Sequence, residues 1–248
     1  MMNDMSGRDG VRLNKWIAES GTCSRREADR LIAERKVTID GRIGVLGDKV
    51  LPGMVVRVEG REVRAKTKRQ QVYIALNKPV GVVCTADPRE PMNVVDYVGH
   101  PERIFPIGRL DKDSEGLLLM TSDGEIVNRI LRAAGRHEKE YVVTVDKPIT
   151  AEFLNSMASG VPILDTVTLP CRITKEDKMR FRIVLVQGLN RQIRRMCEAI
   201  GLEVSRLKRT AIGNVRLGTL PVGKYRELTE KEVHSLLVLS GAVKDKTE

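Results

Sequence analysis

The side chains with the clearest capacity for chemistry lie in residues 108–119, where three carboxylates, Asp111, Asp113 and Glu115, stand between glycines and before an apolar run. A carboxylate beside a buried strand is held in a fixed, partly dry position. There it can act as a nucleophile or a general base. The spacing does not choose among the three acids, and a solvated turn explains the same pattern equally well.

A second segment places arginines at the start of a helix. Gly188 precedes a predicted helix over residues 189–200, and Arg191, Arg194 and Arg195 lie in its first turns. Guanidinium groups in this position can contact phosphate or pair with a carboxylate. Arg194 is next to the apolar face of the helix, so we expect it to reach inward. An exposed basic face is the alternative interpretation.

Tyr141, at the start of a predicted strand, is a third candidate. Aromatic residues make up only 3% of the chain. A tyrosine ring can serve as a stacking platform for an RNA base. Packing in a hydrophobic core is the commoner role for such a residue.

The elements that must position these residues do not alternate strictly between strand and helix. Apolar patterns predict strands over 72–76, 117–121, 141–145, 170–174 and 181–186, and helices over 122–133, 151–159 and 189–200. A capping box, Thr229–Glu232, opens a last helix. The sequence therefore predicts an α+β domain with a mixed, mainly antiparallel sheet flanked by helices.

The first part of the chain reads as a smaller domain. Leu13, Trp16 and Ile17 share one helical face, and a capping box, Ser24–Glu27, opens a second short helix. Strand and turn signals follow, with a tight hairpin at Asp40–Gly41. We divide the chain into three parts on this basis: a small domain over 10–60, a charged linker over 61–71 and a larger domain over 72–240.

The charge favours a polyanionic partner. The chain carries 43 Lys or Arg against 33 Asp or Glu, a net charge of +10, and residues 1–70 hold 16 of the basic and 10 of the acidic residues. Basic surfaces gain affinity for nucleic acid by releasing counterions from phosphates. Arg25, Arg26 and Arg30 oppose the helix dipole near the start of their helix, which suggests that a ligand needs them. A solvated helix face is the alternative.

Cysteine and histidine are few and scattered. None of the four cysteines forms a close pair of the kind that binds a metal, so we expect no zinc site and a reducing compartment. Residues 1–10 are polar and do not resemble a signal peptide, and no apolar run approaches the ~18 residues of a membrane span. We expect a cytoplasmic protein that binds no membrane.

The N-terminal region resembles the small RNA-binding domain named for ribosomal protein S4. Three stretches carry this resemblance: Arg12–Lys15, Ser24–Ala28 and Val37–Gly41. It implies a basic helical face that fits a folded RNA backbone. The expected RNA contacts are Arg12, Lys15, Arg25, Arg26 and Arg30.

The larger domain resembles the ribosomal RNA pseudouridine synthases of the RsuA, RluB, RluE and RluF types. Four ordered motifs carry this resemblance: Gly108–Asp111 with Ser114–Leu118, Lys139–Tyr141, Asn190–Met196, and Leu207–Arg209 with Ile212–Gly213. Within the family the chain is most similar to the RluF type. That similarity lies in three stretches: Ala75–Gly81, His137–Tyr141 and Val186–Asn190.

The resemblance implies roles for individual residues. Asp111 corresponds to the catalytic aspartate, Tyr141 to the tyrosine that stacks on the target base, and Arg194 to the basic residue that pairs with the aspartate. Three further residues are expected to contact the substrate: Leu207, which corresponds to the apolar wall of the uracil pocket, Arg109 and Arg191.

The implied activity is isomerisation of a uridine in structured ribosomal RNA, 23S above others, by a monomer that needs no cofactor. The reaction breaks the bond between base and sugar at N1 and remakes it through C5, so nothing is oxidised. Three alternatives remain open: the same reaction on 16S rRNA or tRNA, an RNA glycosylase, and a non-catalytic RNA-binding assembly factor. The carboxylate, tyrosine and arginine together argue against the last.

Overall fold

The computed structural model describes residues 10–64, 71–133, 137–239, 241 and 243. The chain forms two compact units, Met1–Gln70 and Gln71–Glu248. Each unit has its own hydrophobic core. Within the described residues no helix is both long and apolar enough to cross a membrane.

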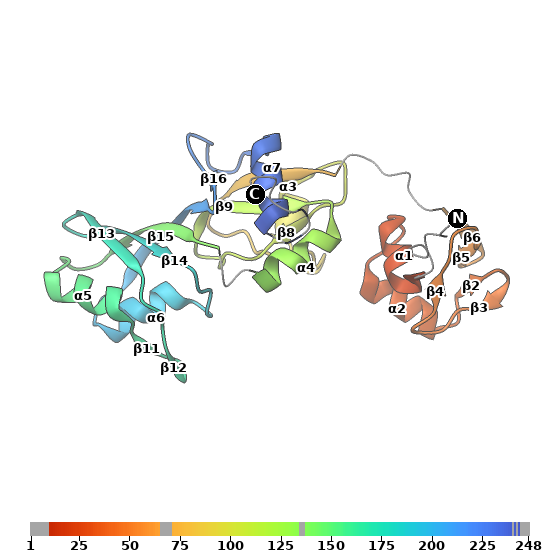
Figure 1. Ribbon diagram of the computed structural model, residues 1–248, viewed down its shortest axis with the longest axis horizontal. Helices are drawn as coiled ribbons and strands as arrows, with labels where there is room; N and C mark the ends of the chain where they lie inside the picture. The colour runs from red at the N-terminus through yellow and green to blue at the C-terminus, as the bar shows by residue number, and fades with distance from the viewer. Residues whose placement is uncertain (1–9, 65–70, 134–136, 240, 242, 244–248) are drawn as a thin grey trace, which may run out of the picture. The chain divides into compact units, whose positions relative to one another are not determined.

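The first unit packs two short helices on a small sheet (Figure 1). Its elements are β1 (Val11–Arg12), α1 (Leu13–Glu19), α2 (Arg25–Ala33), β2 (Val37–Ile39), β3 (Arg42–Ile43), β4 (Lys49–Val50), β5 (Val56–Val58) and β6 (Arg61–Val63). The sheet order is β3-β2-β5-β6, and β1 pairs separately with β4. The apolar faces of both helices, through Leu13, Ile17 and Leu31, pack with Val37 and Val56 of the sheet.

Local signals in the sequence explain these elements. The Ser24 hydroxyl accepts a hydrogen bond from the Glu27 amide at 3.1 Å, so the predicted helix cap is confirmed. Asp40 and Gly41 both have positive φ, +48° and +84°, and join β2 to β3 as a two-residue hairpin turn. Mirror-image turns of this kind match the twist of the flanking strands.

The expected linker over 61–71 was placed too early. Arg61–Val63 forms strand β6 and pairs antiparallel with β5. The reason is a second tight turn, in which Glu59 and Gly60 adopt φ values of +49° and +78° and return the chain to the sheet. Residues 65–70 of the expected linker lie outside the described residues.

The second unit is built around one long mixed sheet. Its strands are β7 (Tyr73–Lys78), β8 (Phe105–Ile107), β9 (Glu115–Thr121), β10 (Lys139–Val145), β11 (Pro162–Ile163), β12 (Thr166–Val167), β13 (Arg172–Asp177), β14 (Arg180–Leu185), β15 (Val204–Ile212), β16 (Val215–Arg216) and β17 (Tyr225–Glu227). Its helices are α3 (Val94–Val98), α4 (Gly124–Ala133), α5 (Ala151–Ser159), α6 (Gln192–Ala199) and α7 (Glu230–Leu239). The strand order is β13-β14-β10-β15-β9-β7-β17, and among the described strands of this sheet only β15 and β9 pair in parallel. The expected α+β architecture is confirmed.

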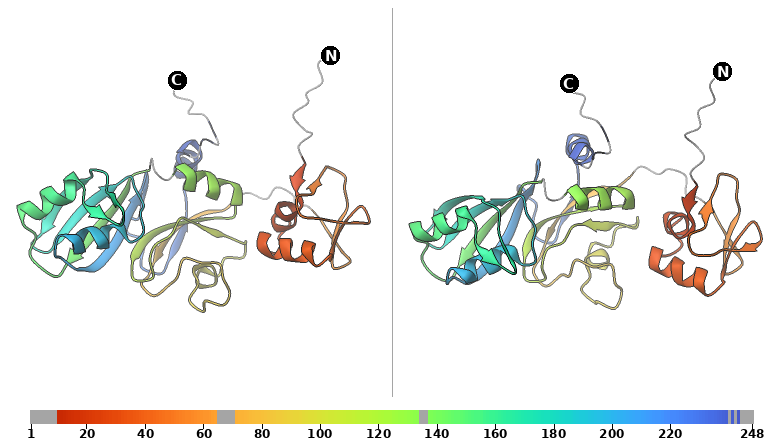
Figure 2. Two further views of the ribbon diagram at one scale, coloured as in Figure 1. Left: turned by 90° about the horizontal axis from the view of Figure 1, so that it is seen from below. Right: turned by 60° about the horizontal axis from the view of Figure 1, so that its bottom comes forward.

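Both faces of the β7–β9 half are covered. Ala75 and Leu117 point into a cluster with α4 and α7, whereas Leu76 and Leu118 point to the opposite face, into a cluster with α3. Figure 2 shows helices on both sides of these strands. Burial on both faces explains why this part of the sequence reads as continuous apolar runs.

In the described part of the chain, helices cover only one face of the other half. Inward-facing residues such as Val143 of β10 and Phe181 and Ile183 of β14 pack against α5 and α6. The residues between them, such as Arg180 and Arg182, are exposed or half-buried. This half therefore shows the alternating pattern of a one-sided antiparallel sheet. Strand β15, which the sequence analysis did not predict, joins the two halves.

Two helix starts complete the comparison. Thr229 and Glu232 cap α7 reciprocally: the Thr229 amide donates to the Glu232 carboxylate at 2.9 Å and the Glu232 amide donates to the Thr229 hydroxyl at 3.3 Å. At α4 the cap is Asp123, whose carboxylate accepts from the Ile126 amide at 3.2 Å. The hydroxyl of Ser122, one residue earlier, accepts from the amide of Val72 at 2.9 Å and takes no part in the cap.

Candidate active site

Asp111 lies in a tight turn immediately before β9. Its backbone carbonyl accepts from the Ser114 amide at 3.1 Å. Leu110 on one side and Ser114 on the other are buried, whereas the Asp111 side chain is 38% exposed. The turn thus combines buried anchors with a carboxylate that a ligand can reach. The segment is therefore a turn, and it also fixes the carboxylate beside a buried strand; the two interpretations made from the sequence are compatible.

Arg191 connects this turn to α6. Its guanidinium nitrogens donate to the two Asp113 carboxylate oxygens at 3.2 and 3.0 Å, and one lies 3.7 Å from Oδ2 of Asp111. The residue adopts a left-handed conformation, φ +49° and ψ +33°, as it caps α6. A non-glycine residue in this region is strained, and such strain is concentrated at functional sites. The backbone conformation therefore supports a role for this arginine.

Arg194 reaches inward, as its position on the helix predicts. Its side chain is only 14% exposed, and it donates to the carbonyls of Val204 at 2.9 Å and Asp113 at 3.0 Å. Its carboxylate partner is Asp113, at 3.3 Å, rather than the expected Asp111. The turn that follows Asp111 brings Asp113 toward the start of α6. There the Asp113 carboxylate is the ion-pair partner of both Arg191 and Arg194.

Asp113 is therefore the acid that ties the turn to α6, a role that the sequence analysis did not give it. The hydrogen bond from Arg191, with the nearby charge of Arg194, holds the pKa of the Asp113 carboxyl below its usual value. The arginines favour its charged form. Asp111 is left with the longer contact to Arg191 and retains an accessible carboxylate.

A buried cation lies beneath the turn. Lys78, at the end of β7, is fully buried and donates to the Pro79 carbonyl at 2.8 Å. Burial lowers the pKa of its ammonium group, while the charges of Asp111 and Asp113 act in the opposite direction. The sequence signal for Lys78 is a lysine that follows Asn77 directly after the apolar run Tyr73–Leu76. Cys84 adds a further tie, since its sulfur accepts from the Leu110 amide at 3.3 Å.

Tyr141 and Leu207 lie on the neighbouring strands β10 and β15. Tyr141 is half-buried and packs against two hydrophobic clusters, one that contains Leu110 and one that contains Leu207. Leu207 itself is buried, with 6% of its surface exposed. The ring thus lies at the junction between the cluster beside Asp111 and the cluster beneath α6. The structure thus brings three predicted residues, Asp111, Tyr141 and Leu207, to one region of the second unit.

Arg109 and Arg209 complete this region. The side chain of Arg109 is exposed, and its carbonyl accepts from the guanidinium of Arg209 at 3.4 Å. Arg209 is buried on β15, in register with Tyr141 on β10. Arg209 had no role among the predicted site residues. Its signal is the alternation of Leu207, Arg209 and Ala211, which places the arginine on an inward-facing row.

The predicted RNA contacts of the first unit differ in their surroundings. Arg30 pairs with Glu27 at 2.5 Å and Glu34 at 3.9 Å, and Lys15 pairs with Glu19 at 3.6 Å. The others are exposed and make no ion pair with the residues that the structure describes: Arg12, Arg25 and Arg26. These three are the better placed to contact phosphate.

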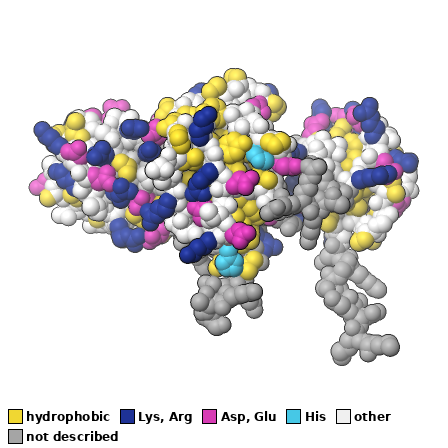
Figure 3. All heavy atoms as spheres, turned by 90° about the horizontal axis from the view of Figure 1, so that it is seen from above, with side chains coloured by type: hydrophobic (Ala, Val, Ile, Leu, Met, Phe, Trp, Pro, Cys, Tyr) yellow, Lys and Arg dark blue, Asp and Glu magenta, His cyan; other side chains and the backbone are white. Residues whose placement is uncertain are grey.

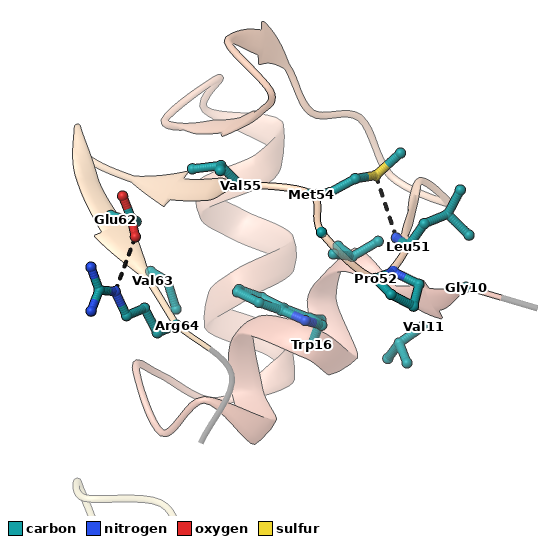
Figure 4. Close-up of a pocket in the computed structure, with 12 residues that line it drawn as sticks. Gly10, Val11, Trp16, Leu51, Pro52, Met54, Val55, Glu62, Val63 and Arg64 are labelled. Atoms are coloured by element: carbon teal, nitrogen blue, oxygen red, sulfur yellow. Dashed lines mark hydrogen bonds and ion pairs between the residues drawn. The ribbon is translucent and has the colours of Figure 1, made fainter. Parts of the chain in front are cut away.

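Two surface features give context to these arginines. On the face shown in Figure 3, Lys and Arg side chains are interspersed with acids instead of forming one continuous basic area. A pocket of about 400 Å³ opens beside Trp16, and Figure 4 shows the apolar side chains of Val11, Met54 and Val63 around it. None of the predicted RNA contacts lines this pocket. Among the described residues no group of three or more His, Cys, Asp or Glu side chains is arranged to hold a metal ion.

Comparisons with known proteins agree with this architecture. Residues 72–199 match the RNA pseudouridylate synthase family, and residues 11–56 match the S4 domain. The chain is 56% identical over 229 residues to the dual-specificity RNA pseudouridine synthase RluF of Escherichia coli (strain K12), covering 92% of this chain and 79% of the relative. It is 38% identical over 238 residues to the ribosomal large subunit pseudouridine synthase B of Bacillus subtilis, covering 92% and 96%. A solved structure of a pseudouridylate synthase aligns with a TM-score of 0.66 and 31% identity, covering 91% of this chain and 99% of that one.

The chain belongs to the RluF-like family of RNA pseudouridine synthases, which are isomerases. Its second unit is the pseudouridine synthase domain and its first unit contains the S4 domain. The family and the fold class inferred from the sequence motifs are thereby confirmed.

Proposed function

We propose that this chain isomerises a uridine of 23S ribosomal RNA to pseudouridine, with Asp111 as the catalytic carboxylate. One observation carries the proposal. Asp111 belongs to a turn whose flanks, Leu110 and Ser114, are buried, and whose other acid, Asp113, has both carboxylate oxygens bound by arginine. Asp113 is the more exposed of the two, at 46% against 38%, but Asp111 has only a 3.7 Å contact with Arg191 to exchange for a substrate.

The reaction breaks the C1′–N1 bond of uridine, turns the uracil, and forms a C1′–C5 bond, while the hydrogen on C5 is lost and N1 gains a proton. Asp111 acts on the ribose or on the uracil ring, as nucleophile or as base. The target must leave its stack, which costs a few kcal/mol and less in a loop or bulge.

The neighbouring residues have distinct proposed roles. The ring of Tyr141 stacks on the extruded base, which is worth about 1–3 kcal/mol. Leu207 contributes the apolar wall beside it. Arg191 and Arg194 orient the Asp111 turn through Asp113, and the exposed Arg109 contacts the RNA backbone near the target. The first unit supplies phosphate contacts.

The substrate assignment rests on the names of two relatives. One is a ribosomal large subunit enzyme, which supports 23S rRNA. The other is called dual-specificity, which supports a second RNA substrate besides the first. The candidates for that second RNA are 16S rRNA and tRNA. We further propose that the protein acts as a cytoplasmic monomer.

The test is to incubate the purified protein with unmodified 23S, 16S and tRNA transcripts and to map pseudouridine by carbodiimide-adduct primer extension. Asp111→Asn is the test variant. Asp165→Asn, in the exposed turn between β11 and β12, is the matched control. We expect a pseudouridine in 23S rRNA with the wild type and the control and none with Asp111→Asn.

Three results would count against the proposal. Pseudouridine formation by Asp111→Asn would refute the catalytic assignment. Modification confined to 16S rRNA or tRNA would refute the 23S assignment alone. Loss of uracil from the RNA, seen as a lower mass, would indicate a glycosylase, because isomerisation leaves the mass unchanged.

A further inference from the structure

Arg209 is a buried arginine that forms no ion pair with the described residues. Only 4% of it is exposed. Nε donates to the Leu117 carbonyl at 2.7 Å and Nη1 to the Arg109 carbonyl at 3.4 Å, whereas Nη2 is buried without a hydrogen-bond partner in the described part of the chain. Buried charges are costly unless they are paired, so such an arrangement needs a reason beyond packing.

The two carbonyls that bind Arg209 bracket the Asp111 turn. Arg109 lies two residues before Asp111, and Leu117 lies six residues after it, within β9. A guanidinium group is planar and rigid, so it fixes the separation of two acceptors more strictly than a flexible ammonium group does. The single side chain of Arg209 therefore joins both ends of the segment that carries Asp111.

The backbone of Arg209 is itself held against this segment. β15 pairs parallel to β9 at this point, with Arg209 opposite Gly116. A Cβ atom at Gly116 would lie 2.2 Å from the Arg209 carbonyl oxygen, so only glycine permits the approach. The position of the guanidinium group relative to the turn is thus fixed by strand pairing on one side and by two hydrogen bonds on the other.

We propose that Arg209 is a positioning residue that holds the segment Arg109–Leu117, and with it the Asp111 carboxylate, in the reactive geometry. This inference rests on the proposed catalytic role of Asp111. Arg191 and Arg194 hold the turn from the α6 side through Asp113, and Arg209 holds it from the sheet. A displacement of about 1 Å at a reacting group can cost about 100-fold in rate.

The test compares two substitutions of Arg209 with a control arginine of the same sheet. Arg209→Met removes the donors and the charge, and Arg209→Lys keeps the charge but not the two-pronged geometry. The control is Arg180→Met on β14, where the exposed guanidinium pairs with Glu176 at 3.3 Å, outside the segment that carries Asp111. Each protein is assayed for its single-turnover rate on 23S rRNA, its affinity for that RNA and its thermal unfolding.

We expect Arg209→Met to react about 100-fold more slowly, with RNA affinity within threefold of wild type. Arg209→Lys should recover part of that rate but remain at least about tenfold slow, since one ammonium cannot hold both carbonyls in plane. Arg180→Met should react within threefold of wild type. A change in rate without a change in affinity, measured well below the melting temperature, separates positioning from a general loss of structure.

Contrary outcomes are separable. Folded Arg209→Met or folded Arg209→Lys protein that reacts at the wild-type rate would overturn the inference, while an inactive Asp111→Asn protein would leave the proposed function standing. If Arg209→Met has no cooperative unfolding transition, the folded Arg209→Lys protein decides alone. Activity in Asp111→Asn would instead remove the proposed function on which the inference rests.

Discussion

Gly116 lies where β9 and β15 run parallel, and replacing it by alanine tests the most crowded contact near the site. Its φ is +105°, and an added Cβ would meet the Arg209 carbonyl oxygen at 2.2 Å and amide nitrogen at 2.7 Å. The conformational penalty is about 1–3 kcal/mol, and overpacking against backbone adds about 1–3 kcal/mol. Gly116→Ala should therefore lose about 3 kcal/mol or more of its free energy of unfolding.

That loss corresponds to a fall in melting temperature of roughly 6–12 °C for a unit of this size. The matched control is Gly124→Ala at the first residue of α4, where an added Cβ meets nothing within 4 Å. It should be neutral or stabilise by up to about 1 kcal/mol. Thermal unfolding followed by circular dichroism measures both. A Gly116→Ala protein that melts within 1 °C of the wild type would falsify the argument.

Three further predictions concern other parts of the chain. Burial lowers the pKa of His137, so below pH ~6.5 the unfolded state gains a proton first and the free energy of unfolding falls by up to about 1.4 kcal/mol per pH unit. Urea titrations of His137→Leu should show a shallower fall with decreasing pH, and the same pH dependence as the wild type would contradict this. Burial raises the pKa of Cys197 to about 12, so Cys197 of the native protein should resist iodoacetamide at pH 8; rapid labelling of Cys197, located by peptide mass spectrometry, would disprove it. Replacing either Arg25 or Arg26 alone by alanine should weaken RNA binding and flatten its salt dependence more than Arg30→Ala does, because Arg30 is already paired with acids; equal effects of the single substitutions would refute the ranking.

Much of the fold follows from local patterns. The caps at Ser24 and Thr229 depend on side-chain oxygens, and the turn at Asp40–Gly41 depends on residue types that tolerate positive φ. Both can be recognised from the residue types in the sequence. The continuous apolar run of β9 and the alternation of β14 reflect burial on two faces and on one face. These features need only near neighbours in the chain, so the sequence is sufficient to predict them.

The site depends on contacts between residues far apart in sequence, and here the prediction was less complete. Arg194 was expected to turn inward and does, but its carboxylate partner is Asp113. Asp111 and Asp113 are the same type of residue, so the residue type does not decide which of them pairs with an arginine of α6. The conformation of the turn between them decides it. Arg209 was quoted within a motif but given no role for a similar reason, because β15 joins β9 and β10 only through long-range pairing.

The most direct test of the central claim is release of the C5 hydrogen. Formation of the new bond at C5 must expel that hydrogen, so 23S rRNA carrying tritium at C5 of uridine reports each turnover. We expect wild-type protein to release about one tritium equivalent per RNA and Asp111→Asn, although it binds the RNA, to release none. Stoichiometric release by Asp111→Asn, or none by the wild type on RNA that it binds tightly, would contradict it.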